Sequence, residues 1–386
     1  MSADERPVNA ARSPPPARVG DPVAAIDTPA LVVDVDAMER NLARMAAYAR
    51  DHRVALRPHA KLHKSVAIAA LQVRAGAVGV CVQKLAEAEV LAAGGVADIF
   101  ITNEIVDPSK LARFAALAGR CTLAIAVDSV LGIERLASAL RAAGTDASVF
   151  VEVDVGQGRC GAAPEAAAVL AQQVLASGLR FAGLQAYHGG AQHLRLPAQR
   201  EAAIGAAVAR VRIATAALAQ AGIACPLVTG AGTGSFVTEA VSGVYGELQA
   251  GSFMFMDADY AQNTPAPGAP RFEHALFVKS QVMSRCATHA VVDAGHKSHA
   301  IDSGMPLVWG QPGLTVRNGG DEHGVLVPAP GAALAALPEL GETVWLVPGP
   351  CDPTVNLHDH YVVVRGGLQG GVVEAVWGVD ARGCAT

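Results

Sequence analysis

The sequence has no strong net charge, no paired cysteines and no long uncharged apolar run, and each absence excludes a class of protein. Its 386 residues carry a formal net charge of −5 with no block of lysines and arginines, which argues against nucleic acid as a partner. The seven cysteines are odd in number and scattered, without a CxxC pair, and they predict reduced thiols in a cytoplasmic protein. No uncharged apolar run approaches the roughly 18–20 residues of a membrane-spanning helix, so no membrane partner is expected.

What remains is the composition of a large globular protein. Hydrophobic residues make up 51% of the chain and charged residues 17%, so a substantial buried core is expected and wholesale disorder is excluded. The length suits two domains, or one barrel with an appendage. Residues 1–26 are expected to form a flexible leader, because the first twenty residues contain four prolines and no apolar stretch. They do not have the pattern of a secretory signal or a transit peptide.

Short apolar or β-branched runs alternate with Ala/Leu-rich helical patterns in the middle of the chain. Eight of these runs are predicted to be strands, at residues 54–56, 78–82, 99–102, 123–127, 149–153, 181–186, 226–228 and 248–249. Their number and spacing predict an α/β fold with a parallel (β/α)8 TIM barrel over residues 54–256. A doubly wound open sheet is the alternative, since the count of short strands decides between the two.

The pattern changes after residue 256. Helical periodicity thins out, and β-rich runs at 275–282, 290–293, 344–347, 361–365 and 372–377 are separated by Gly/Pro turns. Residues 257–386 are therefore predicted to form a β-rich C-terminal domain. The early strand and helix within residues 27–53 lead into the barrel, and the strand is expected to pair with the C-terminal domain.

Polar residues follow nearly every predicted barrel strand. Such side chains would surround the C-terminal mouth of the barrel, where the active sites of this fold lie. Lys61 stands on the first strand-to-helix turn, two residues after His59, and is a candidate Schiff-base nucleophile, although a solvated basic turn has the same sequence features. The other residues at strand ends include Gln83, Asn103, Asp128, Arg159, Tyr187, His188 and His193.

A glycine-rich run, Thr-Gly-Ala-Gly-Thr-Gly-Ser at 229–235, follows the seventh predicted strand. It leaves backbone N–H groups free and adds hydroxyls, which suits a phosphate, although such a run is also typical of an ordinary loop. It lacks the ending of a nucleotide P-loop. Phosphate sites of (β/α)8 barrels favour the loops after strands seven and eight. A phosphate held there, opposite a lysine from strand one, indicates pyridoxal phosphate.

These residues belong to a longer series of motifs that resembles the D-threonine aldolases and their relatives, pyridoxal-phosphate enzymes with an alanine-racemase-like fold. The resemblance covers nearly the whole chain after the leader. The motifs are RPHAK at 57–61, TNE at 102–104, VEVDVGQGRCG at 151–161, LQAYHG at 184–189, GTGS at 232–235, ELQAGS at 247–252, MDADY at 256–260, DEHG at 321–324 and CDPTVNLHD at 351–359. By analogy the fold is an N-terminal barrel with a C-terminal β-domain, usually in a homodimer.

The resemblance also implies roles for single residues. Lys61 is similar to the lysine that forms the Schiff base with the cofactor. Gln249 occupies a place where related racemases have an arginine near the pyridine nitrogen, and a neutral amide suits modest carbanion stabilisation. The other expected cofactor-binding residues are His59, Gln83, Asn103, Arg159, Tyr187, Gly232, Thr233, Gly251 and Ser252.

One departure from the family pattern concerns a divalent metal. Family members carry a histidine two residues before the aspartate of the DPT segment, and the pair binds the metal. Here Asp352 is kept but the histidine is replaced by Pro350, which has no ligand atom. His358 and His360, two apart on a strand-like stretch, could substitute or could be ordinary surface histidines. A metal site at Asp352 (Mn²⁺, Mg²⁺ or Zn²⁺) is therefore left open, and weak binding is expected.

The activity that the resemblance implies is cleavage of D-threonine, or another D-3-hydroxy amino acid, to glycine and an aldehyde. His193 is the candidate base for the β-hydroxyl proton, alone or with a metal-bound water, and a structural loop histidine is the alternative. Other readings are a D-3-hydroxyaspartate aldolase, a D-serine-type or 3-hydroxyaspartate-type dehydratase and a non-catalytic pyridoxal-phosphate carrier. A racemase is the least favoured of these readings.

Overall fold

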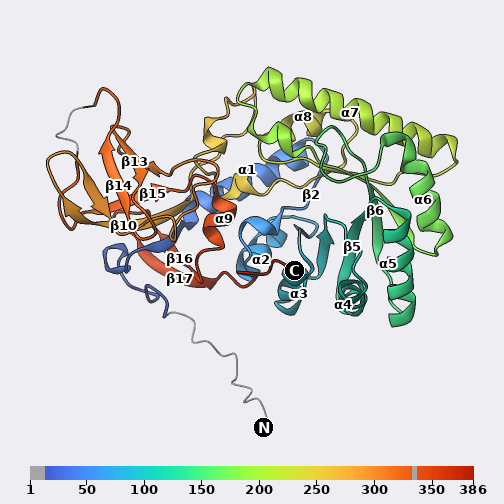
Figure 1. Ribbon diagram of the computed structural model, residues 1–386, viewed down its shortest axis with the longest axis horizontal. Coiled ribbons are helices and arrows are strands. Elements are labelled where there is room, and N and C mark those ends of the chain that lie inside the picture. Colours follow the sequence, from blue (N-terminus) through green and yellow to red (C-terminus); the bar gives the residue numbers. More distant parts are fainter. Residues whose placement is uncertain (1–13, 333–336) are drawn as a thin grey trace, which may run out of the picture.

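The chain folds around two β-sheets, one closed into a barrel and one open (Figure 1). The computed structural model describes residues 14–332 and 337–386. In Figure 1 the barrel and its helices occupy the right side, and the second sheet, drawn in orange and red with one blue strand, occupies the left. Helices α1 (Val35–Asp51) and α9 (Cys351–Val355) lie between the two, and α9 carries one residue of the site described below.

The barrel sheet contains eight parallel strands, as the sequence pattern predicts. They are β2 (Ala55–Leu56), β3 (Val80–Val82), β4 (Asp98–Ile101), β5 (Thr122–Val127), β6 (Ser148–Glu152), β7 (Arg180–Ala186), β8 (Val228–Gly230) and β9 (Glu247–Leu248). Their order is β2-β9-β8-β7-β6-β5-β4-β3. The two edges of the sheet also meet, because the Val78 amide donates to the Leu56 carbonyl and the Cys81 amide to the Pro58 carbonyl, both at 2.9 Å. This closure excludes the doubly wound open sheet.

Helices cover the outside of the barrel. They are α2 (Val66–Arg74), α3 (Leu85–Ala93), α4 (Pro108–Ala118), α5 (Val130–Ala143), α6 (Ala167–Ala176), α7 (Pro197–Gln220) and α8 (Phe236–Val241). Their ends follow local chemistry: Asp107 caps α4 by accepting from the Lys110 amide at 3.0 Å, and α5 ends at Gly144 in the left-handed region with φ +67°. The end of the barrel opposite the polar mouth is filled by Cys81, Phe100, Ala124, Ala126 and Phe150. The barrel is therefore a packed core and not a pore.

Helix α7 is long and apolar enough to meet a length-and-composition criterion for crossing a membrane. It contains Arg210 and Arg212, and Ile204, Val211 and Leu218 on one face are buried against the barrel core. A core-covering helix of a (β/α)8 barrel meets the same criterion, so this feature is weak support for a membrane span.

The second sheet has nine strands. They are β1 (Ala30–Asp34), β10 (Leu276–Arg285), β11 (Ala290–Val292), β12 (Leu307–Val308), β13 (Leu314–Asn318), β14 (Gly324–Pro328), β15 (Thr343–Val347), β16 (His360–Arg365) and β17 (Val372–Gly378). β1 pairs antiparallel with β10 and parallel with β16. The sequence reading missed β12, β13 and β14, which are short and lie between glycine-rich turns. The last barrel strand and β10 flank the expected domain boundary after residue 256, and its position stays a prediction.

The expected leader is only partly described, since residues 1–13 lie outside the described residues. Residues 14–26 differ from the flexible segment that was predicted. Ala17, Val23 and Ile26 are buried against β1, β16 and β17, and the Gly20 amide donates to the Val373 carbonyl at 2.8 Å. Three apolar side chains spaced along a proline-rich segment give no periodic signal, so their burial was not visible in the sequence.

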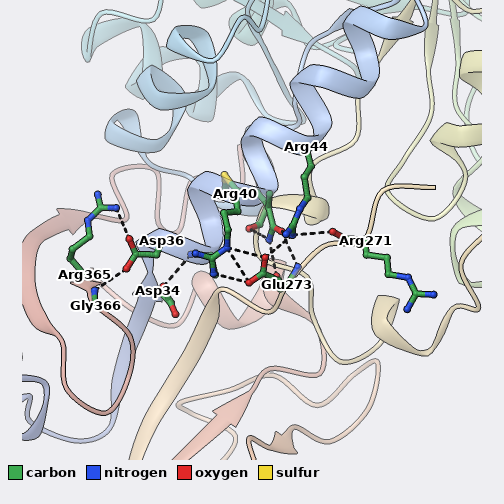
Figure 2. A network of polar contacts seen from close by, with 11 residues as sticks. Asp34, Asp36, Arg40, Arg44, Arg271, Glu273, Arg365 and Gly366 are labelled. Carbon is green, nitrogen blue, oxygen red and sulfur yellow. Dashed lines mark hydrogen bonds and ion pairs between the residues drawn. The ribbon is translucent and has the colours of Figure 1, made fainter. Parts of the chain in front are cut away.

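A surface network of charges joins helix α1 (Val35–Asp51) to both neighbouring regions (Figure 2). Arg40 forms a bidentate pair with Glu273, with nitrogen–oxygen distances of 2.7 and 3.0 Å, and Arg44 adds a contact to the same carboxylate. The hydrogen bonds from Arg40 hold the pKa of Glu273 at about 2. Asp36 accepts from Arg365 and from the Gly366 amide, both at 2.8 Å. The network fixes α1 against the barrel-to-sheet connection and against the β16–β17 turn.

Candidate active site

A cavity of about 280 Å³ lies at the C-terminal mouth of the barrel, beneath α9 (Cys351–Val355). Eleven of the thirteen expected site residues line it: His59, Lys61, Gln83, Arg159, Tyr187, Gly232, Thr233, Gln249, Gly251, Ser252 and Asp352. A neighbouring cavity of about 340 Å³ shares Thr233 and Tyr260 with it but contains none of the expected lysine or metal residues. The smaller cavity is the candidate site, because Lys61 and Asp352 line it.

Lys61 lies in a single 3₁₀ turn, Ala60–Leu62, directly after β2. Its Nζ forms an ion pair with the carboxylate of Asp352 on α9, so the contact joins the barrel to the second sheet region. Burial alone would lower the pKa of Lys61, but the Asp352 charge outweighs burial and the pKa is raised. The Lys61 side chain remains 42% exposed because it faces the cavity. The amine is thus held at the cavity and is accessible to a small molecule.

His59 supports the lysine turn from below. Its Nδ1 accepts from the Lys61 amide at 3.4 Å, and its Nε2 lies 3.1 Å from the Thr102 hydroxyl and 3.0 Å from the Gln83 amide nitrogen. Burial, together with the nearby Lys61 charge, lowers the pKa of His59 well below its usual value. A neutral ring with its nitrogens so engaged positions the turn and is not a free acid or base.

Another part of the cavity lining is made of backbone. The amide N–H groups of Gly232, Thr233, Gly251 and Ser252 make no hydrogen bond to any residue within 14–332 or 337–386. A Cβ on Gly232 would lie 2.4 Å from Gln192 Oε1, and one on Gly251 would lie 2.9 Å from the His59 carbonyl oxygen. Glycine is needed at both positions, and the free N–H groups form a cradle for an anion.

The loop of this cradle is held in an unusual conformation. Ala231 has φ +73°, in the left-handed region that side chains other than glycine seldom adopt. Beneath it Gln192 accepts from the Gly234 amide at 2.9 Å and donates to the Ser235 hydroxyl at 2.7 Å. Ser235 in turn donates to Glu239 at 2.7 Å. This buried network fixes the loop before any ligand binds.

Gln249 closes the floor of the cavity. Its amide donates to the Thr229 hydroxyl at 2.8 Å and to Gln185 Oε1 at 2.7 Å, and Thr229 donates to Glu247 at 2.7 Å. Glu247 is paired with Arg57 inside the barrel at 3.0 Å. The floor therefore presents the neutral Gln249 amide to the cavity. The charged Glu247–Arg57 pair is separated from that amide by Thr229.

Two aromatic side chains and an arginine complete the wall. The Arg159 guanidinium lies 5.7 Å from the centre of the Tyr187 ring, a cation–π arrangement. Burial raises the pKa of Tyr187, although Lys61 and Arg159 oppose this. Tyr260 also lines the cavity, and burial raises its pKa well above the usual value. Both phenols are therefore neutral near pH 7.

Two expected residues lie outside the cavity wall. Asn103 donates to the Gln83 carbonyl at 3.1 Å and so supports a residue that lines the cavity. The His193 ring packs on Tyr260 with 5.1 Å between ring centres, and its Nδ1 lies 2.6 Å from Asp259 Oδ2. Asp259 is buried and also pairs with Arg195. His193 is thus oriented by a fixed carboxylate, one ring away from the cavity.

The sequence reading missed three cavity residues of polar character, Thr102, Gln185 and Tyr260. Thr102 ends a predicted strand, and Gln185 lies two residues before Tyr187 on β7. Their signal was the strand-end rule and the inward alternation of a barrel strand. Tyr260 lies after the barrel in the chain, and only its packing beside the mouth brings it to the site.

The residues present fit pyridoxal phosphate. The cavity combines an amine, a cradle of free N–H groups for a phosphate, and the side chains of Tyr187 and Gln249, which are available to contact a ring. A ligand with an aldehyde at one end and a phosphate at the other requires the amine and the cradle in one cavity.

The residues present do not fit a divalent metal. Among the described residues no group of three or more His, Cys, Asp or Glu side chains could hold such an ion. His358 and His360 do not join Asp352, because they line a separate surface pocket with residues 14–18 and His358 Nε2 contacts the Ser298 carbonyl at 2.7 Å. Of the two alternatives left open for these histidines, their positions favour ordinary histidines over replacement ligands.

Comparison with known proteins gives the same assignment as the geometry. Residues 33–259 match the family model of the alanine racemase N-terminal domain, and residues 275–364 match that of a serine dehydratase domain. The chain is 48% identical over 374 residues to a D-threonine aldolase from Arthrobacter sp., with 96% of each chain covered. It is 43% identical to a 3-hydroxy-D-aspartate aldolase from Paracoccus denitrificans (strain Pd 1222), with 95% of each covered.

A solved structure extends this similarity to three dimensions. The crystal structure of D-threonine aldolase from Filomicrobium marinum superimposes with a TM-score of 0.93 at 49% identity, covering 96% of this chain and all of that one. The fold, the lysine and phosphate walls of the cavity and these relatives agree, and the chain belongs to the D-threonine aldolase family of the alanine-racemase fold.

Proposed function

We propose that the protein is a pyridoxal-phosphate-dependent carbon–carbon lyase that cleaves D-threonine and related D-3-hydroxy amino acids to glycine and an aldehyde. The observation that supports this best is the single cavity in which Lys61 faces a cradle of free amide N–H groups. The relatives named as aldolases supply the reaction type, and the cavity supplies the groups that this reaction needs.

The residues that would hold the cofactor divide by chemistry. Gly232, Thr233, Gly251 and Ser252 would hold the phosphate through their N–H groups, and Lys61 is the amine available to the aldehyde. The cofactor supplies an electron sink for the pair of electrons released from the Cα–Cβ bond. Gln249 cannot protonate the nitrogen of the cofactor ring. The electron sink is therefore weaker than one in which a carboxylic acid is paired with that nitrogen.

The cofactor site is positioned by five further residues: Asn103, Gln83, His59, Arg159 and Tyr187. Asn103 and His59 hold Gln83 and the lysine turn through the hydrogen bonds described above. Arg159 and Tyr187 face the cavity and are the side chains available to orient the ring and the substrate carboxylate. Their stacked arrangement leaves the Arg159 charge for an anionic substrate group.

His193 is proposed to accept the proton of the substrate β-hydroxyl. Asp259 holds its Nδ1, so Nε2 is the nitrogen that can act as base. Loss of that proton allows the oxygen to become the carbonyl of the departing aldehyde while the Cα–Cβ bond breaks. In the structure the His193 ring contacts Tyr260 and does not line the cavity itself. The base therefore approaches the substrate from the side of the cavity that Tyr260 forms.

A 3-hydroxy-D-aspartate aldolase is the second candidate, favoured by the relative from Paracoccus denitrificans. The substrate would carry a carboxylate in place of the methyl group, and Arg159 is the nearest cavity cation besides Lys61. The aldehyde product would then be glyoxylate.

The test is to load the purified protein with pyridoxal phosphate and supply D-threonine, D-3-hydroxyaspartate or D-serine in turn. Glycine with acetaldehyde from the first substrate supports the main proposal, and glycine with glyoxylate mainly from the second supports the alternative. Lys61→Ala serves as the matched variant, with loss of the imine absorbance and of cleavage expected. Ammonia without glycine would assign a dehydratase, and no product from any substrate would assign a carrier.

A homodimer and a cytoplasmic location are also proposed, from the analogy and from the reduced, unpaired cysteines. Light scattering coupled to size-exclusion chromatography gives the oligomeric state directly. A monomer mass at micromolar concentration would contradict the proposed dimer.

A further inference from the structure

The position that would complete a metal site at Asp352 is filled by a residue without a donor atom. We infer that this protein carries out its reaction without a divalent cation at Asp352, and that Asp352 here serves instead as the ion-pair partner that positions Lys61. The inference rests on the proposed lyase function for its catalytic part, and on the described residues alone for its binding part.

The first observation is what Asp352 contacts. Its carboxylate pairs with the Lys61 ammonium, the charge that a cation would otherwise have to displace. When the amine of Lys61 is bound to the cofactor aldehyde, Asp352 is a single carboxylate facing a water-accessible cavity. One monodentate carboxylate is a poor site for Mn²⁺ or Mg²⁺ in competition with water.

The second observation is that the neighbouring donors are turned away. Both oxygens of Asp257 accept from backbone amides, Oδ1 from Tyr260 at 2.8 Å and Oδ2 from Cys351 at 3.2 Å. The Cys351 side chain is packed in the apolar core of the second sheet. Neither residue lines the cavity that contains Asp352. The Asp257 carboxylate and the Cys351 sulfur therefore stabilise the structure around the first turn of α9.

The third observation is the geometry of position 350. Pro350 is the N-cap of α9 and Asp352 is the second residue of its first turn, so the two positions lie at the same end of one short helix. Pro350 is buried, and its carbonyl oxygen accepts from the Thr354 hydroxyl at 2.7 Å. An imidazole at position 350 would add the nitrogen donor that the site lacks, at a backbone conformation (φ −101°, ψ 136°) open to any residue.

The experiment measures Mn²⁺ binding to the pyridoxal-phosphate-loaded protein by isothermal titration calorimetry and by metal analysis after dialysis. Wild type is expected to retain no stoichiometric Mn²⁺, and Pro350→His is expected to retain one ion per chain. Pro350→Ala is the matched control, since it removes the proline ring without adding a donor. Circular dichroism establishes that both variants are folded.

The wild-type measurement needs no variant and decides the binding part by itself. One tightly bound Mn²⁺ per wild-type chain would overturn the inference, whatever the activity. Among preparations that cleave a D-3-hydroxy amino acid, an unchanged rate in EDTA supports the catalytic part, and a rate abolished by EDTA and restored by Mn²⁺ overturns it. A protein that neither binds Mn²⁺ nor cleaves any substrate overturns the proposed function and the catalytic part, but supports the binding part.

Discussion

The two walls of the cavity are built from different materials. The phosphate wall consists of backbone N–H groups from the loops after β8 and β9, and it needs glycine where a Cβ would meet neighbouring atoms. The lysine wall consists of side chains from the barrel and from α9, joined by the Lys61–Asp352 pair. The first wall depends on how closely the chain can approach, and the second on which side chain stands at each position.

This difference predicts unequal consequences of substitutions on the two walls. A substitution on the phosphate wall displaces backbone and threatens binding of the cofactor as a whole. A substitution on the lysine wall changes a side chain and leaves the backbone of the phosphate wall in place. Three variants test this difference, beginning with the largest expected effect.

Gly251→Ala should have the largest effect. Its φ of −117° is open to alanine, so the effect comes from the added Cβ alone, which would lie 2.9 Å from the His59 carbonyl oxygen. Overpacking of this kind costs about 1–3 kcal/mol, and a loss of that size in the cradle corresponds to roughly a 5- to 150-fold weaker affinity for pyridoxal phosphate. Titration of the imine absorbance measures that affinity.

Gly205→Ala on α7 is the matched control, because a Cβ there meets no atom within 4 Å. It should bind the cofactor as wild type does, with a small gain in stability from the better helix former. If Gly251→Ala also binds the cofactor normally, the phosphate wall is more adaptable than its backbone contacts indicate, and the contrast between the walls is lost.

The two walls also differ in how far the sequence could predict them. The eight barrel strands and the glycine-rich loop followed from local patterns, because strand runs and phosphate-binding turns are encoded over a few neighbouring residues. The Lys61–Asp352 pair joins residues 291 apart in the chain, and nothing local to either one encodes it. Tyr260 was missed for the same reason, and β12 has only two residues, too few to separate from a turn.

His193 illustrates a limit of a different kind. Its place after Tyr187 was predicted to bring it to the mouth, and the structure puts it beside Tyr260 and Asp259 instead of in the cavity wall. The loop between β7 and α7 sets this placement through Asn263, which donates to the Gln192 carbonyl at 2.8 Å, and through Arg195. Such loop packing depends on residues that come after the barrel in the chain.

Asp259→Asn should have the intermediate effect of the three variants. It changes a side chain, as a substitution on the lysine wall would, and not the backbone. An amide can present its NH₂ to Nδ1 and so favour the wrong tautomer of His193, and a fall in kcat of about tenfold or more is expected. KM and the affinity for the cofactor should change little. Steady-state kinetics separates kcat from KM, and absorbance titration gives the cofactor affinity.

Asp146→Asn is the control for that variant, since Asp146 is exposed and its only described ion pair, with Arg180, is long at 3.8 Å. It should leave kcat unchanged. An Asp259→Asn protein that loses cofactor affinity but keeps kcat would assign Asp259 to the fold of the mouth and remove the support for His193 as the base.

Glu239→Gln should leave turnover nearly unchanged and alter the pH dependence of stability. Burial raises the pKa of Glu239 to about 7 in the folded protein, whereas an exposed glutamate titrates near 4.5. Between those values the folded state holds more protons than the unfolded state, so wild-type stability falls as pH rises from about 4.5 through about 7.

Glutamine does not titrate and still offers an acceptor to the Ser235 hydroxyl. Urea unfolding of the cofactor-free protein should therefore show the variant gaining roughly 1–3 kcal/mol on wild type between pH 5 and pH 8. Exposed Glu134→Gln should show no such gain. A parallel pH dependence in wild type and Glu239→Gln would mean that the pKa of Glu239 is the same in the folded and unfolded states, and that burial under the phosphate wall does not raise it.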